Sequence, residues 1–368
     1  MNKVRLGIIG LGTMGQKYAE ILVQQKIEQA QLVAICSSTS QKLEKMRKKH
    51  GESLRYYEEE EKLFLDPTVD AVLITTPHYS HPQLAQEAIN ANKHFLCEKP
   101  IGVYTKNVVT LDEKIKEHPA LSCAIVFNQR TQPIYIKAKE LVDQGALGEI
   151  RRSNWISTNW YRSQEYYDAV SWRGSWKEDG GGVLLNQAVH QLDLWQWICG
   201  MPQRIYGHIY PNKLRNIEVE TEGTIYAEYK NGATGFFTAA TTEAMGTNRF
   251  EIVGSTGKLV IENEQLHLWK MIQDETFWPH SKDTPSYEEV PIDLINEKDQ
   301  QHQKVLENFV QAILFDEPLL ASATEGIKSL SIINATYLSS WLDKGVDLPL
   351  DSQLYFEELT KKSNDACF

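Results

Sequence analysis

The start of the chain constrains its fold more than any other stretch. Residues 4–9, VRLGII, form a short branched apolar run of the kind that builds a buried parallel strand. Gly10, Gly12 and Gly15 follow in a G-x-G-x-x-G pattern, and a helical pattern begins at once. A second apolar run covers residues 32–36. The order predicts the first strand–helix–strand unit of a doubly wound parallel sheet.

Each glycine has a physical role if this turn holds a dinucleotide. Gly10 permits the tight turn, Gly12 lets the backbone approach a pyrophosphate, and Gly15 lets the helix pack on the strand. The first helical residues, Thr13 and Met14, would offer backbone N–H groups to the phosphates. We therefore predict a dinucleotide here, against the alternative of a bare turn without a ligand.

Composition limits the class of protein. A chain of 368 residues suits two domains, at about 100 to 200 residues each. The net charge of −11 argues against a nucleic-acid surface or a basic membrane patch. The first strand begins almost at residue 1 and no apolar stretch approaches the length of a membrane span, so we expect no signal peptide and a cytoplasmic protein. The five cysteines, at 36, 97, 123, 199 and 367, lack metal-site spacing, so we expect reduced thiols and no metal.

The end of the second strand bears on which cofactor is used. An acidic residue usually stands there to bind the adenine ribose, but this chain has a run of small hydroxyl residues from Ser37 to Ser40. Ser37 and Ser38, with Lys42 or Arg47 nearby, could hold a 2′-phosphate. We therefore favour NADP over NAD, while the serines could also serve only as helix caps.

Polar residues follow two later strands of the predicted sheet. Residues 71–75 form a buried strand, and residues 94–97 form another. Ligands of such sheets bind at the carboxyl ends of the strands, so the side chains there are candidates for cofactor contact. They are Thr75, Thr76, Pro77, His78, His81, Glu98 and Lys99.

The segment from residue 149 to 176 is dense in aromatic residues and arginine. Aromatic rings with interleaved polar groups suit a carbohydrate, whose C–H faces stack on rings while its hydroxyls need donors and acceptors. Tyr161 and Arg173 are the preferred substrate contacts. Further on, Asn186, His190 and Asp193 fall at helical spacing beside an apolar stripe, so we expect one polar helix face toward a ligand.

The remainder predicts an α+β second domain with a large, mainly antiparallel sheet. Alternating runs follow residue 201, and Asn231-Gly232 joins two of them as a hairpin. Helices are expected at about 300–315 and 324–344. The predicted division is a Rossmann-type domain at 1–127, a substrate and oligomerisation domain at 128–360, and a frayed tail at 361–368.

The motifs GIIGLGTMG, TTPHYSH, CEKP and GGGVLLNQAVHQLD together resemble those of the Gfo/Idh/MocA family of sugar and cyclitol dehydrogenases. The resemblance implies that Lys99 lies beside the nicotinamide and the reacting carbon. His78 stands where the family usually has asparagine, and Asn186 where it has aspartate. Asparagine cannot take a proton, so Lys99 and His190 would share proton transfer, with Asn186 and Asp193 orienting hydroxyls.

The resemblance also implies a function and an assembly. We expect hydride transfer between NAD(P) and a secondary alcohol or ketone of a sugar or cyclitol, in a homodimer or homotetramer. Two alternatives stay open: a nicotinamide-dependent, glycosidase-like elimination, and a non-catalytic sensor of sugar or dinucleotide on the same fold.

Overall fold

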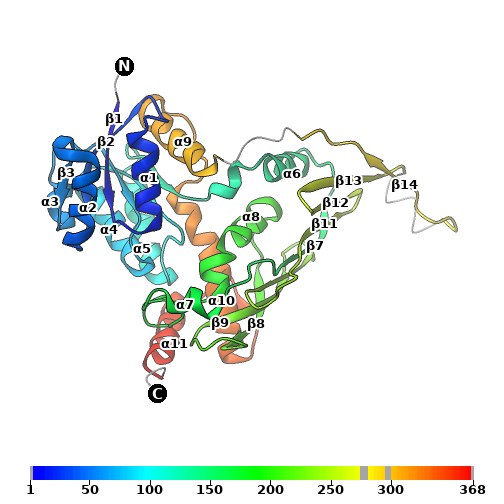
Figure 1. Cartoon of the computed structure of the whole chain (residues 1–368). Coiled ribbons are helices and arrows are strands. Elements are labelled where there is room, and N and C mark those ends of the chain that lie inside the picture. The colour runs from blue at the N-terminus through cyan, green and yellow to red at the C-terminus, as the bar shows by residue number, and fades with distance from the viewer. Residues whose placement is uncertain (1–2, 274–280, 295–299, 366–368) are drawn as a thin grey trace. The chain divides into compact units, whose positions relative to one another are not determined.

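The computed structural model describes residues 3–273, 281–294 and 300–365, which divide into two compact units (Figure 1). The first unit runs to Asn128 and takes in Gln300–Ile327; the second begins at Gln129 and resumes at Lys328. The sequence assigned residues 300–327 to the second domain, whereas the structure assigns them to the first. The reason is hydrophobic: the helix in this segment carries an apolar face that completes the core of the first unit.

The first unit contains the predicted doubly wound sheet. Its six described strands are all parallel and lie in the order β3-β2-β1-β4-β5-β6, so the strand order reverses between β1 and β4. The strands are β1 (Val4–Ile9), β2 (Ala30–Cys36), β3 (Arg55–Tyr57), β4 (Ala71–Ile74), β5 (His94–Cys97) and β6 (Cys123–Ile125).

Helices complete this unit. They are α1 (Thr13–Val23), α2 (Ser40–His50), α3 (Glu60–Phe64), α4 (His81–Asn90), α5 (Thr105–Glu117) and α9 (Gln301–Phe315), with short 3-10 turns at Gly51–Ser53, His78–Ser80, Asn128–Thr131 and Ala323–Glu325. Leu6 and Ile8 of β1 are fully buried in a core that also holds Leu306 and Phe309 of α9. The return of α9 therefore stabilises the strand that leads into the glycine turn.

The second unit is built on a mixed sheet of nine described strands, in the order β14-β13-β12-β11-β7-β10-β9-β8-β15. All neighbouring pairs are antiparallel except β7 and β10, which confirms the predicted sheet type. The strands are β7 (Ile150–Ser157), β8 (Arg204–Pro211), β9 (Glu220–Glu228), β10 (Thr234–Ala240), β11 (Asn248–Gly254), β12 (Gly257–Glu262), β13 (Gln265–Met271), β14 (Tyr287–Val290) and β15 (Val346–Asp347).

Helices pack on one face of this sheet. They include α6 (Pro133–Asp143), a π-helix at Val183–Gln187, α8 (Val189–Cys199) and α10 (Gly326–Leu342). The unit also contains α7 (Gln164–Asp168) and α11 (Ser352–Asp365). Trp195 of α8 donates to the Ser153 hydroxyl of β7 at 2.9 Å, and Ser339 of α10 accepts from the Gly207 N–H of β8 at 2.9 Å. Successive side chains of a strand point to opposite faces of the sheet. The side chains that do not point toward α8 and α10 therefore lie on the other face, which these helices leave uncovered.

The predicted frayed tail is wrong for residues 361–365, which continue helix α11. Tyr355 and Leu359 of this helix are buried, so its apolar side fixes it to the unit. Residues 366–368, including Cys367, lie outside the described residues. None of the helices in the described part of the chain combines the length and apolar character that crossing a membrane requires.

Candidate functional site

The glycine turn after β1 is shaped as the sequence predicts for a dinucleotide. Gly10 adopts φ +98°, and a Cβ there would lie 2.8 Å from the Thr75 carbonyl oxygen. A Cβ on Gly15 would collide with the carbonyl of Gly10. A Cβ on Gly12 would instead meet nothing nearer than 4.0 Å, so the protein leaves space on that side of the turn. Two glycines thus close the turn, and Gly12 keeps a surface open for a ligand.

Helix α1 starts at this open surface without a side-chain cap. Gly12 is its N-cap residue, no side chain accepts a capping hydrogen bond there, and the first turn contains no acidic residue. The first N–H groups of a helix have no acceptor within it, so Thr13, Met14 and Gly15 present donors and a partial positive charge. These residues fit the pyrophosphate of a dinucleotide.

Thr75, at the end of β4, holds the turn in place. Its hydroxyl donates to the Gly10 carbonyl at 2.8 Å and lies 3.1 Å from the Ile9 carbonyl. Thr76 shares a 2.6 Å hydrogen bond with Ser80, whose hydroxyl also contacts the Pro77 carbonyl. The predicted cluster at the end of β4 is therefore formed, but the Thr75 hydroxyl is turned toward the backbone of the glycine turn.

His81, predicted to contact the cofactor, has both ring nitrogens beside backbone carbonyls. The residue is fully buried, with Nδ1 at 2.7 Å from the Pro100 carbonyl and Nε2 at 2.8 Å from the Thr76 carbonyl. Burial lowers the pKa of its imidazole. His81 therefore ties the turn after β4 to the turn after β5, which carries Lys99. His78 is also buried, at 7% exposure.

Glu98 likewise faces inward rather than toward a ligand. Its carboxylate accepts from the Tyr18 hydroxyl at 3.0 Å and from the Lys99 N–H at 3.2 Å. The Tyr18 hydroxyl lies 3.4 Å from Nδ1 of His302 on α9. Burial raises the pKa of Glu98 and that of Tyr18. Lys99, next in the chain, stays partly exposed at the carboxyl end of β5. Glu98, predicted to contact the cofactor, thus supports the backbone at Lys99.

The end of β2 carries a carboxylate that the sequence analysis missed. Ser37 is buried, while Ser38 is exposed. The Ser40 hydroxyl donates to Glu58 Oε1 at 2.8 Å, and Glu58 follows the neighbouring strand β3. Arg47 is held by Glu44 and Glu52 at the other end of α2. The hydroxyl residues from Ser37 to Ser40 are thus accompanied by a carboxylate that follows the neighbouring strand, because parallel strands end at one edge of a sheet.

In the second unit, Asn186 and His190 share the accessible side of one helical segment. From Gly181 to Trp195 they are the two residues that stay partly exposed, while the others are buried. Asn186 belongs to the π-helix and His190 to α8. π-Turns within helices occur frequently at functional sites, and this one interrupts the regular α-helical spacing that the sequence suggests.

Two residues distant in sequence hold the start of this segment. Glu220 of β9 accepts from the Gly182 N–H at 2.8 Å, the Leu184 N–H at 2.9 Å and the Tyr337 hydroxyl at 2.7 Å. A Cβ on Gly181 would collide with Tyr337, and one on Gly182 with Glu220. Burial raises the pKa of Glu220 to about 7. The glycines before the helix are thus needed because Glu220 and Tyr337 pack directly on their backbone.

Asp193, predicted to bind the substrate, forms a buried ion pair with Arg130. Its carboxylate accepts from Arg130 Nε at 2.8 Å and from Arg130 Nη2 at 2.7 Å, and both side chains are 1% exposed. The third member of the predicted polar row therefore serves a buried ion pair. Asp193 lies three residues after His190 in α8 and is buried, whereas His190 is partly exposed.

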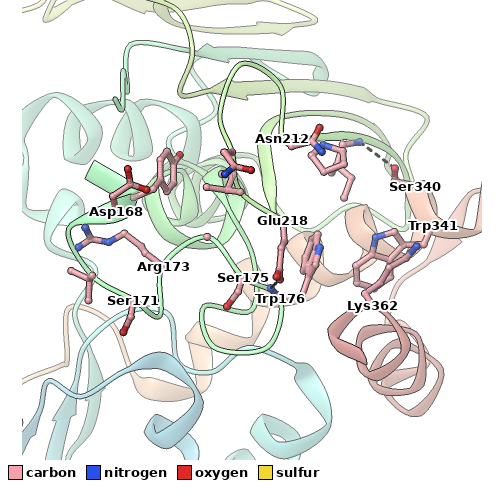
Figure 2. A pocket seen from close by; sticks show the side chains of 17 residues that line it. Asp168, Ser171, Arg173, Ser175, Trp176, Asn212, Glu218, Ser340, Trp341 and Lys362 are labelled. Carbon is pink, nitrogen blue, oxygen red and sulfur yellow. Dashed lines mark hydrogen bonds between the residues drawn. The ribbon is translucent and has the colours of Figure 1, made fainter. Parts of the chain in front are cut away.

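The two predicted substrate contacts in the aromatic segment differ in their exposure and in the groups around them. Tyr161 is 48% exposed, with the Arg215 guanidinium 5.3 Å from its ring. Arg173 lies over the Tyr166 ring at 4.2 Å and donates to the Tyr166 carbonyl at 2.7 Å. Arg173 also lines a cavity of about 1000 Å³ within the second unit (Figure 2). The structure thus places Arg173 at a cavity.

Family models account for most of the chain. Residues 4–125 match the model described as an oxidoreductase family with an NAD-binding Rossmann fold, and residues 135–260 match the Gfo/Idh/MocA C-terminal domain. The chain belongs to the Gfo/Idh/MocA family. It is therefore an NAD(P)-dependent oxidoreductase, as the resemblance of its motifs implied.

Curated relatives and solved structures agree with this assignment. Myo-inositol 2-dehydrogenase of Thermotoga maritima is 28% identical over 71% of this chain and 75% of its own length. Scyllo-inositol 2-dehydrogenase (NAD(+)) of Bacillus subtilis is 26% identical over 71% of this chain and 74% of its own. The WlbA dehydrogenase of Bordetella pertussis, solved with NADH and UDP-GlcNAcA, has a TM-score of 0.80 at 24% identity, over 95% of this chain and 100% of its own. It supports the fold.

Metal chemistry has no candidate site among the residues that the structure describes, since no group of three His, Cys, Asp or Glu side chains there could hold an ion. Cys36, Cys97 and Cys123 are buried free thiols, and burial raises the pKa of Cys36 and Cys123 to about 12.

Proposed function

We propose that the protein binds NAD(H) and catalyses reversible hydride transfer to or from a secondary alcohol carbon of a sugar or cyclitol. The observation that carries this proposal is the architecture of the first unit. A glycine turn that fits a pyrophosphate follows β1, and His81 ties the turn after β4 to the turn that carries Lys99. Relatives named as inositol dehydrogenases support a polyol as the substrate class.

The carboxylate of Glu58 is the reason to prefer NAD over NADP. It accepts from Ser40, the first residue of α2, just after the end of β2, where the adenine ribose of a bound dinucleotide is expected. A carboxylate bonds a ribose diol and repels a 2′-phosphate. The NADP preference favoured by the serines alone is replaced by this proposal.

Lys99 is proposed as the group that moves the proton. A bound nicotinamide supplies the hydride chemistry, so the protein must bind the alcohol and handle its proton. During oxidation the Lys99 amine takes the hydroxyl proton, and during reduction its ammonium returns one to the substrate oxygen. Glu98 and His81 restrain the backbone on either side of Lys99.

Asn186 and His190 are proposed to bind the substrate's hydroxyl groups. Both stay partly exposed on a segment that is otherwise buried from Gly181 to Trp195. The Asn186 side-chain amide donates to Asp179 at 3.3 Å, which orients the side chain. Asparagine cannot exchange a proton, so His190 is the second proton-transfer group in this proposal.

A homo-oligomer is proposed through the open face of the large sheet. Phe236 of β10, Ile156 of β7 and Tyr206 of β8 are 46%, 44% and 37% exposed on that face. Tyr226 of β9 joins Tyr206 and Phe236, with ring centroids 5.9 and 5.1 Å away. Exposed apolar patches of this kind mark association sites on soluble proteins.

Titration of the purified chain with NADH and NADPH, followed by turnover on a panel of inositols and aldoses, tests the proposal. We expect tighter binding of NADH and net cofactor reduction with at least one polyol. Binding without turnover would favour the sensor alternative. Release of a glycosidic leaving group without net cofactor reduction would favour the elimination alternative. Failure to bind either dinucleotide would refute the proposal.

A further inference from the structure

The cavity that contains Arg173 is formed entirely by the second unit. Its walls are the segment from Tyr167 to Trp176, the end of β8, the segment from Asn216 to Glu218, and residues of α10 and α11 (Figure 2). The volume of about 1000 Å³ lies at the upper end of the range for small-molecule sites. The cavity is therefore large enough for a sugar ring with a substituent.

One wall offers a fixed aromatic surface. Trp341 is partly buried and lines the cavity. Its ring stacks between those of Tyr337, at 5.8 Å, and Tyr355, at 5.6 Å, and meets Trp176 edge-on at 5.3 Å. Such packing holds the indole in one orientation at little entropic cost on binding. The hydroxyl and amide groups of Ser171, Ser175, Asn212 and Asn216 also line the cavity and suit a polyhydroxylated ligand.

The charged side chains of the cavity differ in their hydrogen-bond and ion-pair partners. Glu218 accepts from the Trp176 N–H at 3.2 Å, and Asp168 accepts from the Gln164 amide at 2.9 Å. Arg173 and Lys362 form no ion pair with any carboxylate of the described residues, and the buried Nε of Arg173 lacks an acceptor there. Arg173 donates to the Tyr166 carbonyl through Nη1, so its Nε is the donor that still lacks an acceptor. Together with the Lys362 ammonium, this donor favours an anionic ligand.

The same wall is bonded to a proposed substrate residue. Asp179 accepts from the Gly174 N–H at 3.1 Å through one oxygen and from the Asn186 amide at 3.3 Å through the other. Glu218 fixes the far side of this segment, since its N–H donates to the Gly174 carbonyl at 2.8 Å. A ligand that shifts this wall would therefore move the carboxylate that orients Asn186.

We propose that this cavity binds an acidic sugar, a hydroxylated ring that carries a carboxylate or phosphate, and that its occupancy adjusts Asn186. The sugar ring lies against the aromatic wall that contains Trp176 and Trp341, and Arg173 and Lys362 bind the anionic group. The inference rests on the proposed function for its link to turnover, whereas the binding itself does not require it. The ligand is either a second unit of the substrate or a separate effector.

Calorimetric titration of the whole chain with D-glucuronate, and with D-glucose as its neutral counterpart, tests the binding. We expect glucuronate to bind at least tenfold more tightly than glucose, since a charge-assisted hydrogen bond contributes about 1.5–3 kcal/mol. Lys362→Gln should lose about tenfold in glucuronate affinity. Lys361→Gln, on the adjacent and exposed lysine paired with Glu358, is the matched control and should bind as wild type. Circular dichroism confirms that both variants are folded.

Two results overturn the inference: glucuronate binding no better than glucose, or not at all, and a Lys362→Gln variant that binds as wild type. Consumption of glucuronate by wild type with NAD would identify the ligand as substrate. Altered turnover of a neutral polyol, without consumption of glucuronate, would identify an effector. NADH titration of the same samples distinguishes the two proposals. Loss of dinucleotide binding would refute the proposed function, whereas the sugar titration would still test the cavity.

Discussion

Two buried carboxyl groups hold the turns from which the proposed site residues project. Glu98 supports the Lys99 backbone in the first unit, and Glu220 anchors the segment that carries Asn186 and His190 in the second. Both have a raised pKa because burial disfavours their charged form. Neither carboxyl group has to contact a ligand to affect the site, because each fixes the backbone near a residue that is proposed to bind one.

Glu220 should make stability depend on pH in a defined direction. Its folded-state pKa of about 7 lies above the ordinary value of 4.5, so the folded protein binds this proton more tightly than the unfolded chain. Stability from this group is therefore fully present below about pH 4.5 and decreases as the pH rises to about 7. The unfolding free energy of wild type minus that of Glu220→Gln should fall between pH 5 and pH 8, as measured by urea denaturation.

A matched control for this experiment is Glu222→Gln, two residues along β9 on the partly exposed face. Its difference from wild type should not follow the same curve. A Glu220→Gln difference that is constant from pH 5 to pH 8 would show that the buried carboxyl group does not titrate in this range.

Glu58 should set the cofactor preference. Glu58→Gln removes the negative charge beside Ser40, so the ratio of NADPH to NADH dissociation constants should fall about tenfold, equivalent to about 1.4 kcal/mol. Nicotinamide fluorescence titration measures both constants. Glu59→Gln is the control, because Glu59 pairs with Lys62 and not with Ser40. An unchanged ratio in Glu58→Gln would contradict the role of Glu58 and would favour the hydroxyl residues from Ser37 to Ser40 as the basis of the cofactor preference.

Residues that depend on local sequence were predictable, and residues that depend on long-range contact were not. The spacing of Gly10, Gly12 and Gly15 predicts their geometry, because the turn is made within one short segment. Glu58 and Glu220 act on residues 18 and at least 36 positions away, so no local pattern connects them. The buried states of His81 and Asp193 were missed for the same reason.

At the scale of elements, the turn after β5 carries Lys99, and the π-helix and α8 carry Asn186 and His190. The sequence located β1 and β5 to the residue, because each is an apolar run bounded by Gly or by charged residues. It predicted a regular helix through Asn186 and did not predict the π-helix, which depends on the fit of residues 181–182 against Glu220 and Tyr337. Helix α11 was missed and its end was taken for a frayed tail.

Gly182→Ala should separate the two units' contributions. The added Cβ would collide with Glu220, so the turn must shift, at a cost of about 1–3 kcal/mol in stability. Turnover should fall at least tenfold, whereas the NADH dissociation constant should stay within about twofold, since the glycine turn of the first unit is untouched. Steady-state kinetics and fluorescence titration check this. Wild-type turnover in a folded Gly182→Ala protein would contradict a positioning role for the segment.

At the scale of the molecule, each unit has its own core and its own part of the proposed chemistry. The sheet types of both units follow from hydrophobic patterning and were predicted correctly. The return of α9 to the first unit was not, because an amphipathic helix does not encode which core it joins. The open sheet face remains the strongest candidate for association between copies.

Phe236→Glu should weaken the proposed oligomer. The substitution places a charge in the centre of the aromatic patch, where burial against a second copy would be unfavourable. Light scattering coupled to size exclusion should report a mass near that of one chain, 42.1 kDa, where wild type gives a multiple. Val109→Glu, at a 40% exposed site on α5, is the control and should keep the wild-type mass. A monomeric wild type would contradict this assembly.

The central claim has two parts: Lys99 transfers the proton of the substrate hydroxyl, and the binding of NAD(H) does not depend on Lys99. The measurement that tests it most directly is turnover of Lys99→Met on the best polyol, beside its NADH dissociation constant. The account predicts that turnover falls by at least a hundredfold, in the range by which general acid–base groups contribute, about 10²–10⁴. It predicts an NADH affinity within about threefold of wild type, because the glycine turn binds the pyrophosphate. Wild-type turnover in Lys99→Met would contradict the account.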